Sequence, residues 1–157
     1  MQQLDERPST TGPSKITQMI QEEHDLLFAM LKEIRAVCAN TANPNCANCT
    51  SELQQNCSNL AYNKLETLLH YMLEHFTEEE RLMRGMAKTH EERNYHQAHL
   101  EHHANISATL AQCAQRLVRN QSTDAFIRIS HLIEHWIDDH IARFDSKIAM
   151  FLGCHFL

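Results

Sequence analysis

The chain has 157 residues, a formal net charge of −6, and only 3 Gly and 3 Pro. This length predicts one domain with its own hydrophobic core. The negative charge argues against a nucleic-acid partner, and the scarcity of Gly and Pro favours long helices over strands joined by tight turns. No apolar run approaches the roughly 20 residues that cross a bilayer, and the polar N-terminus has no apolar signal region. We therefore expect a cytoplasmic protein without a membrane partner.

Apolar residues at helical spacing begin after a polar N-terminal stretch. Residues 1–13 are expected to be a disordered tail, and a first helix is expected over residues 14–39. After a loop rich in cysteine, Ser51 and Gln54 predict a capping box that begins a second helix, and Gly85 predicts its end.

Two further helices follow at short intervals. Thr89 and Glu92 form a second expected capping box, which begins a helix that runs to about residue 120. A fourth helix is predicted over residues 123–152. Four long helices with short connections predict an all-α fold, an up-down-up-down antiparallel four-helix bundle that occupies residues 14–157.

The second helix carries a histidine and a carboxylate at metal-binding spacing. His75 and Glu79 stand four residues apart, so both side chains lie on one face of a helix, one turn apart. His70 and Glu74 have the same spacing, but they lie about 140° around the helix from the first pair. Both pairs cannot face one centre, and we expect His70 to be solvated.

The first and third helices supply further histidines. The first offers His24, which is flanked by apolar residues. On the third, His99 and His103 stand four residues apart on the face that Ile106 continues, so both can bind one ion. His96 remains an alternative to His99 if the helical register differs. The remaining histidines of this helix, His90 and His102, are expected to be exposed or hydrogen-bonded.

The fourth helix carries two histidine sets. His140 and Asp145 are surrounded by apolar residues that would face the core. His131 and His135 are also four residues apart, but His131 lies opposite His140 on the helical wheel. We expect that second pair to face solvent.

Taken together, these segments resemble the four helices of the hemerythrin family in order. The resemblance rests on IQEEHDLLFAML, HFTEEERLM, HLEHHANI and WIDDHIARFD and covers about residues 16–152. It implies a non-haem centre of two bridged Fe ions. By position, the resemblance gives His99, His103 and His140 to one iron, His24 and His75 to the other, and Glu79 and Asp145 as bridges.

Such a centre would keep one position open. Two octahedral irons offer about twelve coordination positions, and the seven side chains with one bridging oxygen fill all but one. The open position falls on the iron with two histidines and would take a small ligand such as O2. The carboxylate-rich alternative, typical of ferritin-like proteins, needs Glu-x-x-His pairs, and this sequence has none. Ile106, Trp136 and Ile137 lie one turn from the proposed ligands and are expected to shield the open site.

The loop between the first two helices carries four cysteines in a symmetric pattern. Cys46 and Cys49 form a C-x-x-C motif, and Cys38 and Cys57 lie eight residues outside it. Such a set can bind Zn or an iron–sulfur cluster, or form a disulfide or redox-active dithiol, and it can equally be a loop of free thiols.

Three functions are therefore compatible with the sequence. The first is reversible binding of O2 for storage, delivery or sensing, without enzymatic activity. The second is a di-iron enzyme or redox sensor that acts on peroxide or nitric oxide, for which the cysteine-rich loop would be the electron route. The third is a structural bundle that holds zinc or iron. No protein partner can be inferred.

Overall fold

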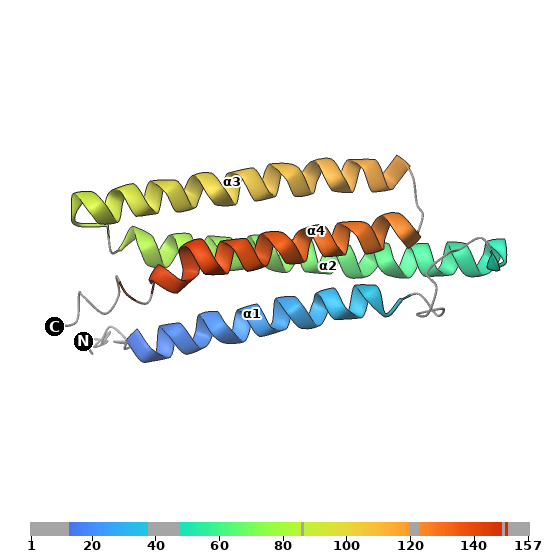
Figure 1. Cartoon of the computed structure of the whole chain (residues 1–157), viewed down its shortest axis with the longest axis horizontal. Helices are drawn as coiled ribbons and strands as arrows, with labels where there is room; N and C mark the ends of the chain where they lie inside the picture. Colours follow the sequence, from blue (N-terminus) through green and yellow to red (C-terminus); the bar gives the residue numbers. More distant parts are fainter. Residues whose placement is uncertain (1–12, 38–47, 86, 120–122, 149, 151–157) are drawn as a thin grey trace, which may run out of the picture.

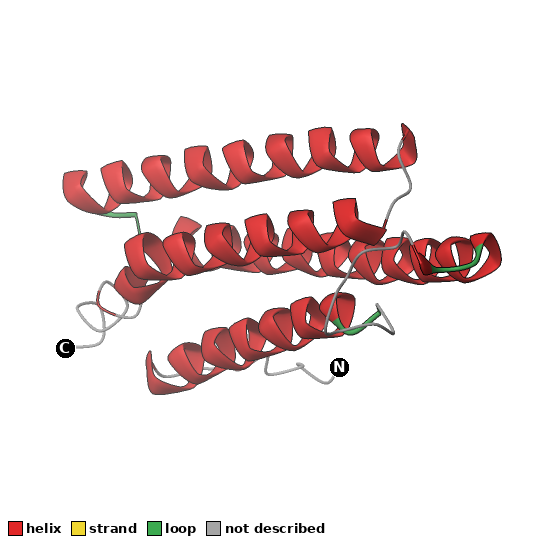
Figure 2. Cartoon of the chain, turned by 45° about the vertical axis from the view of Figure 1, so that its right-hand side comes forward, coloured by secondary structure: helices red, strands yellow, loops and turns green. Residues whose placement is uncertain are grey.

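The computed structural model describes residues 13–37, 48–85, 87–119, 123–148 and 150. Its elements are α1 (Pro13–Arg35), α2 (Ser51–Arg84), α3 (His90–Arg119) and α4 (Thr123–His140), which a π-helical turn, η2 (Ile141–Asp145), extends. The described residues contain no strand (Figure 2). The all-α fold predicted from the sequence is confirmed. The expected tail falls outside the described residues, apart from Pro13, which already belongs to α1.

The four helices alternate in direction along the chain. Figure 1 shows α1 and α3 running one way along the long axis and α2 and α4 running the other. This is the predicted up-down-up-down order. α2 contacts each of the other three helices, and α4 does the same. The N-terminal part of α2 extends past the ends of its neighbours (Figure 1).

One main hydrophobic core fills the bundle, and a smaller cluster lies near one end. The amphipathic pattern explains both, because apolar residues at helical spacing share a face and exclude water together. The small cluster consists of Ile16, Ile20, Met83 and Ile148, with Tyr95 packed against it. The main core comprises Leu27, Leu31, Ile34, Val37, Ala61, Leu65, Leu68, Met72, Phe76, Ile106, Leu110, Phe126, Ile133 and Ile137.

The helix starts agree only in part with the sequence prediction. α2 begins at Ser51, but its cap is Thr50, whose extended backbone lets its side chain accept the Leu53 N–H. The predicted capping box of Ser51 and Gln54 is therefore wrong, because Ser51 is already in the helix. The box at α3 is confirmed: Glu92 N–H donates to Thr89 Oγ1, and Thr89 N–H donates to Glu92 Oε2.

The end of the bundle departs from a regular α-helix. The sequence predicts one continuous helix from residue 123 to residue 152, but its backbone widens into η2 directly after His140. Within the described part of the chain, no helix is long and apolar enough to cross a membrane.

Candidate metal centre

Seven buried side chains meet between the helices. All of them are at most 4% exposed, although all are polar or ionisable. Because a buried polar group is costly without a partner, such a gathering needs a compensating interaction. The seven are the residues proposed as ligands from the sequence: His24 on α1, His75 and Glu79 on α2, His99 and His103 on α3, His140 on α4 and Asp145 in η2.

The first ligand-like group joins three histidines and one carboxylate. Glu79, His99, His103 and His140 each offer one atom, and these atoms lie within 4.8 Å of one another. The Nε2 atoms of His99 and His103 both lie 3.2 Å from Nε2 of His140. Glu79 Oε2 lies 3.2 Å from His103 Nε2. Three imidazole nitrogens that converge in this way are typical of a metal site.

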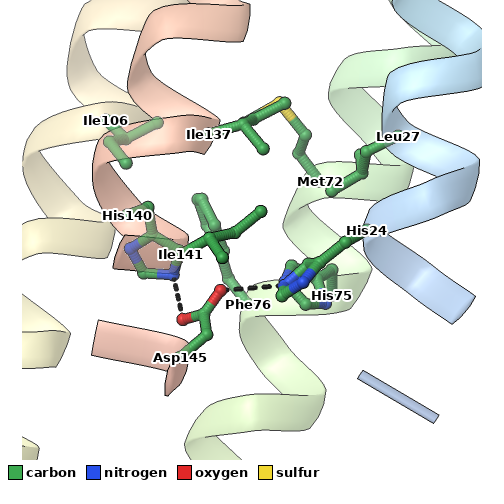
Figure 3. Close-up of a pocket in the computed structure, with 10 residues that line it drawn as sticks. All are labelled: His24, Leu27, Met72, His75, Phe76, Ile106, Ile137, His140, Ile141 and Asp145. Carbon is green, nitrogen blue, oxygen red and sulfur yellow. Dashed lines mark ion pairs between the residues drawn. The ribbon is translucent and has the colours of Figure 1, made fainter. Parts of the chain in front are cut away.

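The second group lies beside the first and shares a residue with it. His24, His75, Glu79 and Asp145 also offer atoms within 4.8 Å of one another. His24 Nε2 lies 2.8 Å from Asp145 Oδ2, and His75 Nε2 lies 3.6 Å from Glu79 Oε1. Asp145 Oδ1 reaches back to the first group, 2.9 Å from His140 Nε2 (Figure 3). Both carboxylates thus contact histidines of both groups, as bridging ligands would.

The π-helical turn explains how His140 and Asp145 reach the same site. In a regular α-helix, residues five apart lie about 140° from each other around the axis. A π-turn makes hydrogen bonds between residues five apart, and the Ser146 N–H bonds to the Ile141 carbonyl in this way. Five residues then complete about one turn, so both side chains face inward. Such turns often occur at functional sites.

The nitrogen and oxygen atoms that converge here are better placed to bind metal ions than to hydrogen-bond with one another. His24 Nε2, His75 Nε2, Glu79 Oε1 and both Asp145 oxygens are buried and have no hydrogen bond to any described residue. They lie at ion-pair distances but not in hydrogen-bond geometry. Imidazole nitrogens and carboxylate oxygens are ligands that iron accepts. The residues present therefore fit the metal centre that the resemblance implies.

Charges inside the cluster shift its pKa values strongly. Burial disfavours the protonated ring of His140, but close contacts with the carboxylates of Asp145 and Glu79 outweigh it and raise the pKa of His140 to about 9. Burial likewise opposes ionisation of Glu79, but contacts with His103, His140 and His99 hold its pKa below the usual value. Without metal, the cluster therefore keeps its carboxylates ionised beside the protonated ring of His140. These carboxylates stabilise positive charge at the site.

The comparisons with known proteins agree with this geometry. The family model described as "Hemerythrin HHE cation binding domain" matches residues 15–152. The chain belongs to the hemerythrin family. Neither the comparison with curated proteins nor that with solved structures gave a match. The protein is therefore a hemerythrin-like domain with a cluster of histidines and carboxylates that could hold metal.

Two carboxylates at the edge of this hemerythrin site hold the outer nitrogens of its histidines. Glu23 Oε2 lies 2.6 Å from His75 Nδ1, and Glu80 Oε1 lies 3.0 Å from His103 Nδ1. Such contacts fix ring orientation and leave Nε2 to face the metal. The role of Glu23 was missed from the sequence. Its position directly before His24 in the chain gave no sign that it reaches another helix.

The other histidines described from the sequence belong to neither group. His70, with Glu74, is exposed on the outer face of α2, as predicted. His131 and His135 are exposed on α4, also as predicted. His102 is half-buried, and its ring stacks on that of His140 with centroids 5.1 Å apart. His90 is exposed, and His96, the alternative to His99, is half-buried and belongs to neither group.

A small enclosed cavity lies against the second group of this hemerythrin centre. Its volume is about 10 Å³, room for the centre of roughly one water-sized molecule. Figure 3 shows apolar side chains on one side of it and polar side chains on the other. Ile106 and Ile137 line the cavity, whereas Trp136 is not part of its lining and packs against the main core. The predicted shielding of an open metal position by these residues stays a prediction. The lining comprises His24, Leu27, Met72, His75, Phe76, Ile106, Ile137, His140, Ile141 and Asp145.

A second hollow opens toward the outside between α1 and η2. It has a volume of about 180 Å³, and Thr17, Gln21 and Ser146 are among its polar lining. His24, Ile141 and Asp145 line both this hollow and the enclosed cavity. These three side chains are therefore the partition between the cavity and this hollow.

The cysteine set can be followed only in part. Cys38 and Cys46 lie outside the described residues. Cys49 and Cys57 are half-buried and form no disulfide with a described residue, and Cys57 packs against the main core. The expectation of a zinc, iron–sulfur or disulfide site in this loop therefore stays a prediction.

Proposed function

We propose that this chain binds O2 reversibly at a centre of two Fe ions, for storage, delivery or sensing. The observation that carries this proposal is the enclosed cavity of about 10 Å³ beside His24, His75 and Asp145. Its size suits a diatomic ligand and leaves no space for an organic substrate. Its apolar wall keeps bulk water from the bound ligand.

The proposed ligand set follows the two groups. His99, His103 and His140 would hold one ion, His24 and His75 would hold the other, and Glu79 and Asp145 would be shared between them. The sharing of Glu79 between both groups supports the bridge. His24 and His75, which would hold the second ion, line the cavity, and this supports an open coordination position on that side. When bound, the ferrous ions supply the electrons that hold O2.

The side chains around the centre have separate tasks. Glu23 and Glu80 orient the rings of His75 and His103 through their Nδ1 atoms. Phe76 lies nearly parallel to the ring of His103, with centroids 4.0 Å apart, and limits its rotation. Ile106 and Ile137 form part of the apolar wall that separates the cavity from bulk water.

An optical titration tests the proposal. Iron is added under argon, the spectrum is recorded, air is admitted, and O2 is then removed. We expect a visible ligand-to-metal band that forms in air and disappears when O2 is removed. The His75→Ala variant should lose this band. His70→Ala is the matched control, since His70 is an exposed histidine on the same helix.

Other outcomes would contradict reversible O2 binding. A band that forms and never reverses would favour the enzyme or redox sensor that acts on peroxide or nitric oxide. Bound iron without any band would mean that the open position is blocked. Stable zinc binding with no iron uptake would favour a structural metal site.

A further inference from the structure

Tyr95 connects a histidine of α3 to the π-helical turn. It lies one helical turn before His99, and its ring packs edge-on against that of His99 with centroids 5.6 Å apart. Its hydroxyl donates a hydrogen bond of 2.6 Å to the Phe144 carbonyl oxygen. The ring also packs against the small cluster that contains Met83 and Ile148. Tyr95 is thus held on several sides and contacts the residue directly before Asp145.

The acceptor of this bond is part of the turn that orients Asp145. Phe144 belongs to η2, and the Ser146 N–H contacts the carbonyl oxygens of both Ile141 and Phe144. A hydroxyl from another helix that bonds to Phe144 fixes the peptide between Phe144 and Asp145. It therefore acts on the backbone at the point where the Asp145 side chain begins.

We infer that Tyr95 is a positioning residue, whose hydroxyl holds η2 in its π form so that Asp145 faces the histidines before any ion arrives. Regular α-helix is the competing form, since π-turns are rare. In that form Asp145 would lie about 140° from His140 and leave the site. The Tyr95 hydroxyl on α3 donates to the Phe144 carbonyl in the π form, and this bond favours the π-turn over regular α-helix.

The surroundings keep Tyr95 a donor. Its half-buried position, together with the nearby charges of Asp145 and Glu79, raises the pKa of its phenol above the usual value. The hydroxyl therefore stays protonated through the physiological range and cannot become a phenolate that would repel the carbonyl.

The inference rests on the proposed function only in treating Asp145 as a metal ligand. The test therefore uses Co²⁺ or Zn²⁺ in competition with a chromophoric chelator, without O2. Tyr95→Phe keeps the ring and removes the hydroxyl, which leaves the Phe144 carbonyl without this donor. We expect metal affinity to fall roughly tenfold. Tyr62→Phe is the matched control, because Tyr62 packs edge-on against Phe126 in the main core.

A double-mutant cycle separates positioning from general packing. In an Asp145→Ala background, Tyr95→Phe should cause no further loss of metal affinity, because the side chain that it positions is gone. An equal further loss would overturn the inference. Hydrogen exchange of the metal-free protein gives a second readout: the amides of residues 141–148 should exchange roughly tenfold faster in Tyr95→Phe, while those in the middle of α2 do not change.

Unchanged affinity together with unchanged exchange in η2 would also overturn the inference. If Tyr95→Phe does not fold, the unaltered protein still decides the question. Its Tyr95 hydroxyl proton should be visible by NMR as a slowly exchanging signal close to residues 144 and 145. Rapid exchange of this proton with water would contradict the proposed role. A failure of O2 binding alone would leave these results unaffected.

Discussion

Glu23 on α1 and His75 on α2 meet across the helix interface, where Glu23 Oε2 lies 2.6 Å from His75 Nδ1. The His75 side chain is 1% exposed and that of Glu23 is 23% exposed, so the contact runs from the site to the surface. Burial opposes protonation of His75, but the bond to Glu23 and the charge of Glu79 outweigh it, and the pKa of His75 is raised. The carboxylate of Glu23 thus orients the ring and makes it a stronger ligand.

Replacing Glu23 should therefore weaken the metal centre. We expect Glu23→Ala to lower Zn²⁺ affinity by about 10- to 100-fold, the usual range for a carboxylate that supports a histidine ligand. Chelator competition measures this. Glu22→Ala is the control, because Glu22 is exposed and accepts a bond from Gln18 on the same helix. An equal loss in both variants would mean a general effect of charge.

Metal affinity should depend on pH through His140. Its pKa of about 9 means that the metal-free ring is protonated at neutral pH, and a binding ion must displace that proton. Affinity should therefore rise with pH by about one decade per unit from this group alone, and this contribution should level off above the pKa. Isothermal titration in buffers of different ionisation enthalpy counts the protons released. An absence of proton release at neutral pH would contradict the prediction.

Ile141 should control how fast small ligands reach the site. It is the apolar member of the partition between the cavity and the outer hollow, and the other two members, His24 and Asp145, are proposed ligands. We expect Ile141→Ala to speed both association and dissociation of azide at the oxidised iron protein by on the order of tenfold, a barrier lower by about 1.4 kcal/mol. The equilibrium constant for azide binding should change little, because a lower barrier along the entry path raises the association and dissociation rates by the same factor.

Stopped-flow absorbance gives both azide rates. Ile129→Ala is the control: Ile129 lies on α4, is half-buried as Ile141 is, and packs against the main core. If Ile129→Ala speeds azide binding as much as Ile141→Ala does, loosening of the bundle and not the partition is the cause.

A substitution in the main core should lower the stability of the fold without changing how many metal ions bind. Phe126 is fully buried in the core and lies outside both metal groups and the cavity lining. Phe126→Ala should lower the free energy of unfolding by about 3–5 kcal/mol, the range for a large side chain replaced by a cavity. Urea denaturation of the metal-free protein measures it. Metal stoichiometry at low temperature should not change, and Leu132→Ala, at a position 38% exposed, should cost far less.

The amino-acid sequence was sufficient to predict the helices and to group most of the side chains that meet between them, because both depend on spacing. Residues four apart on a helix share a face, so His75 with Glu79 and His99 with His103 could be paired from their positions in the chain alone. The apolar pattern then indicated which faces point inward. Thr50 shows the limit, because Thr50 and Ser51 are both good caps and only the backbone decides between them.

Other parts of the site depend on geometry that spacing does not encode. His140 and Asp145 are five residues apart, and a regular helix would separate them. The family resemblance implied a ligand role for both, and the π-turn explains how both side chains face the same histidines. Glu23 and Tyr95 act on residues far away in the chain, through contacts between helices. Trp136 lies one turn from His140 along α4, yet it packs against the main core.

The π-turn also accommodates one more residue than a regular helix needs. Five residues complete about one turn here, whereas about four do so in an α-helix. If residues 141–145 became regular α-helix at unchanged length, everything after them would turn by about 100° around the axis. Ile148, which is fully buried in the small cluster, would then leave its place among those apolar side chains. Deleting one residue between 141 and 144 would instead place His140 and Asp145 four apart, a spacing that suits an α-helix, and would keep Ile148 facing inward. The same inward face can therefore be built with one residue fewer, provided that the widened turn is lost together with that residue.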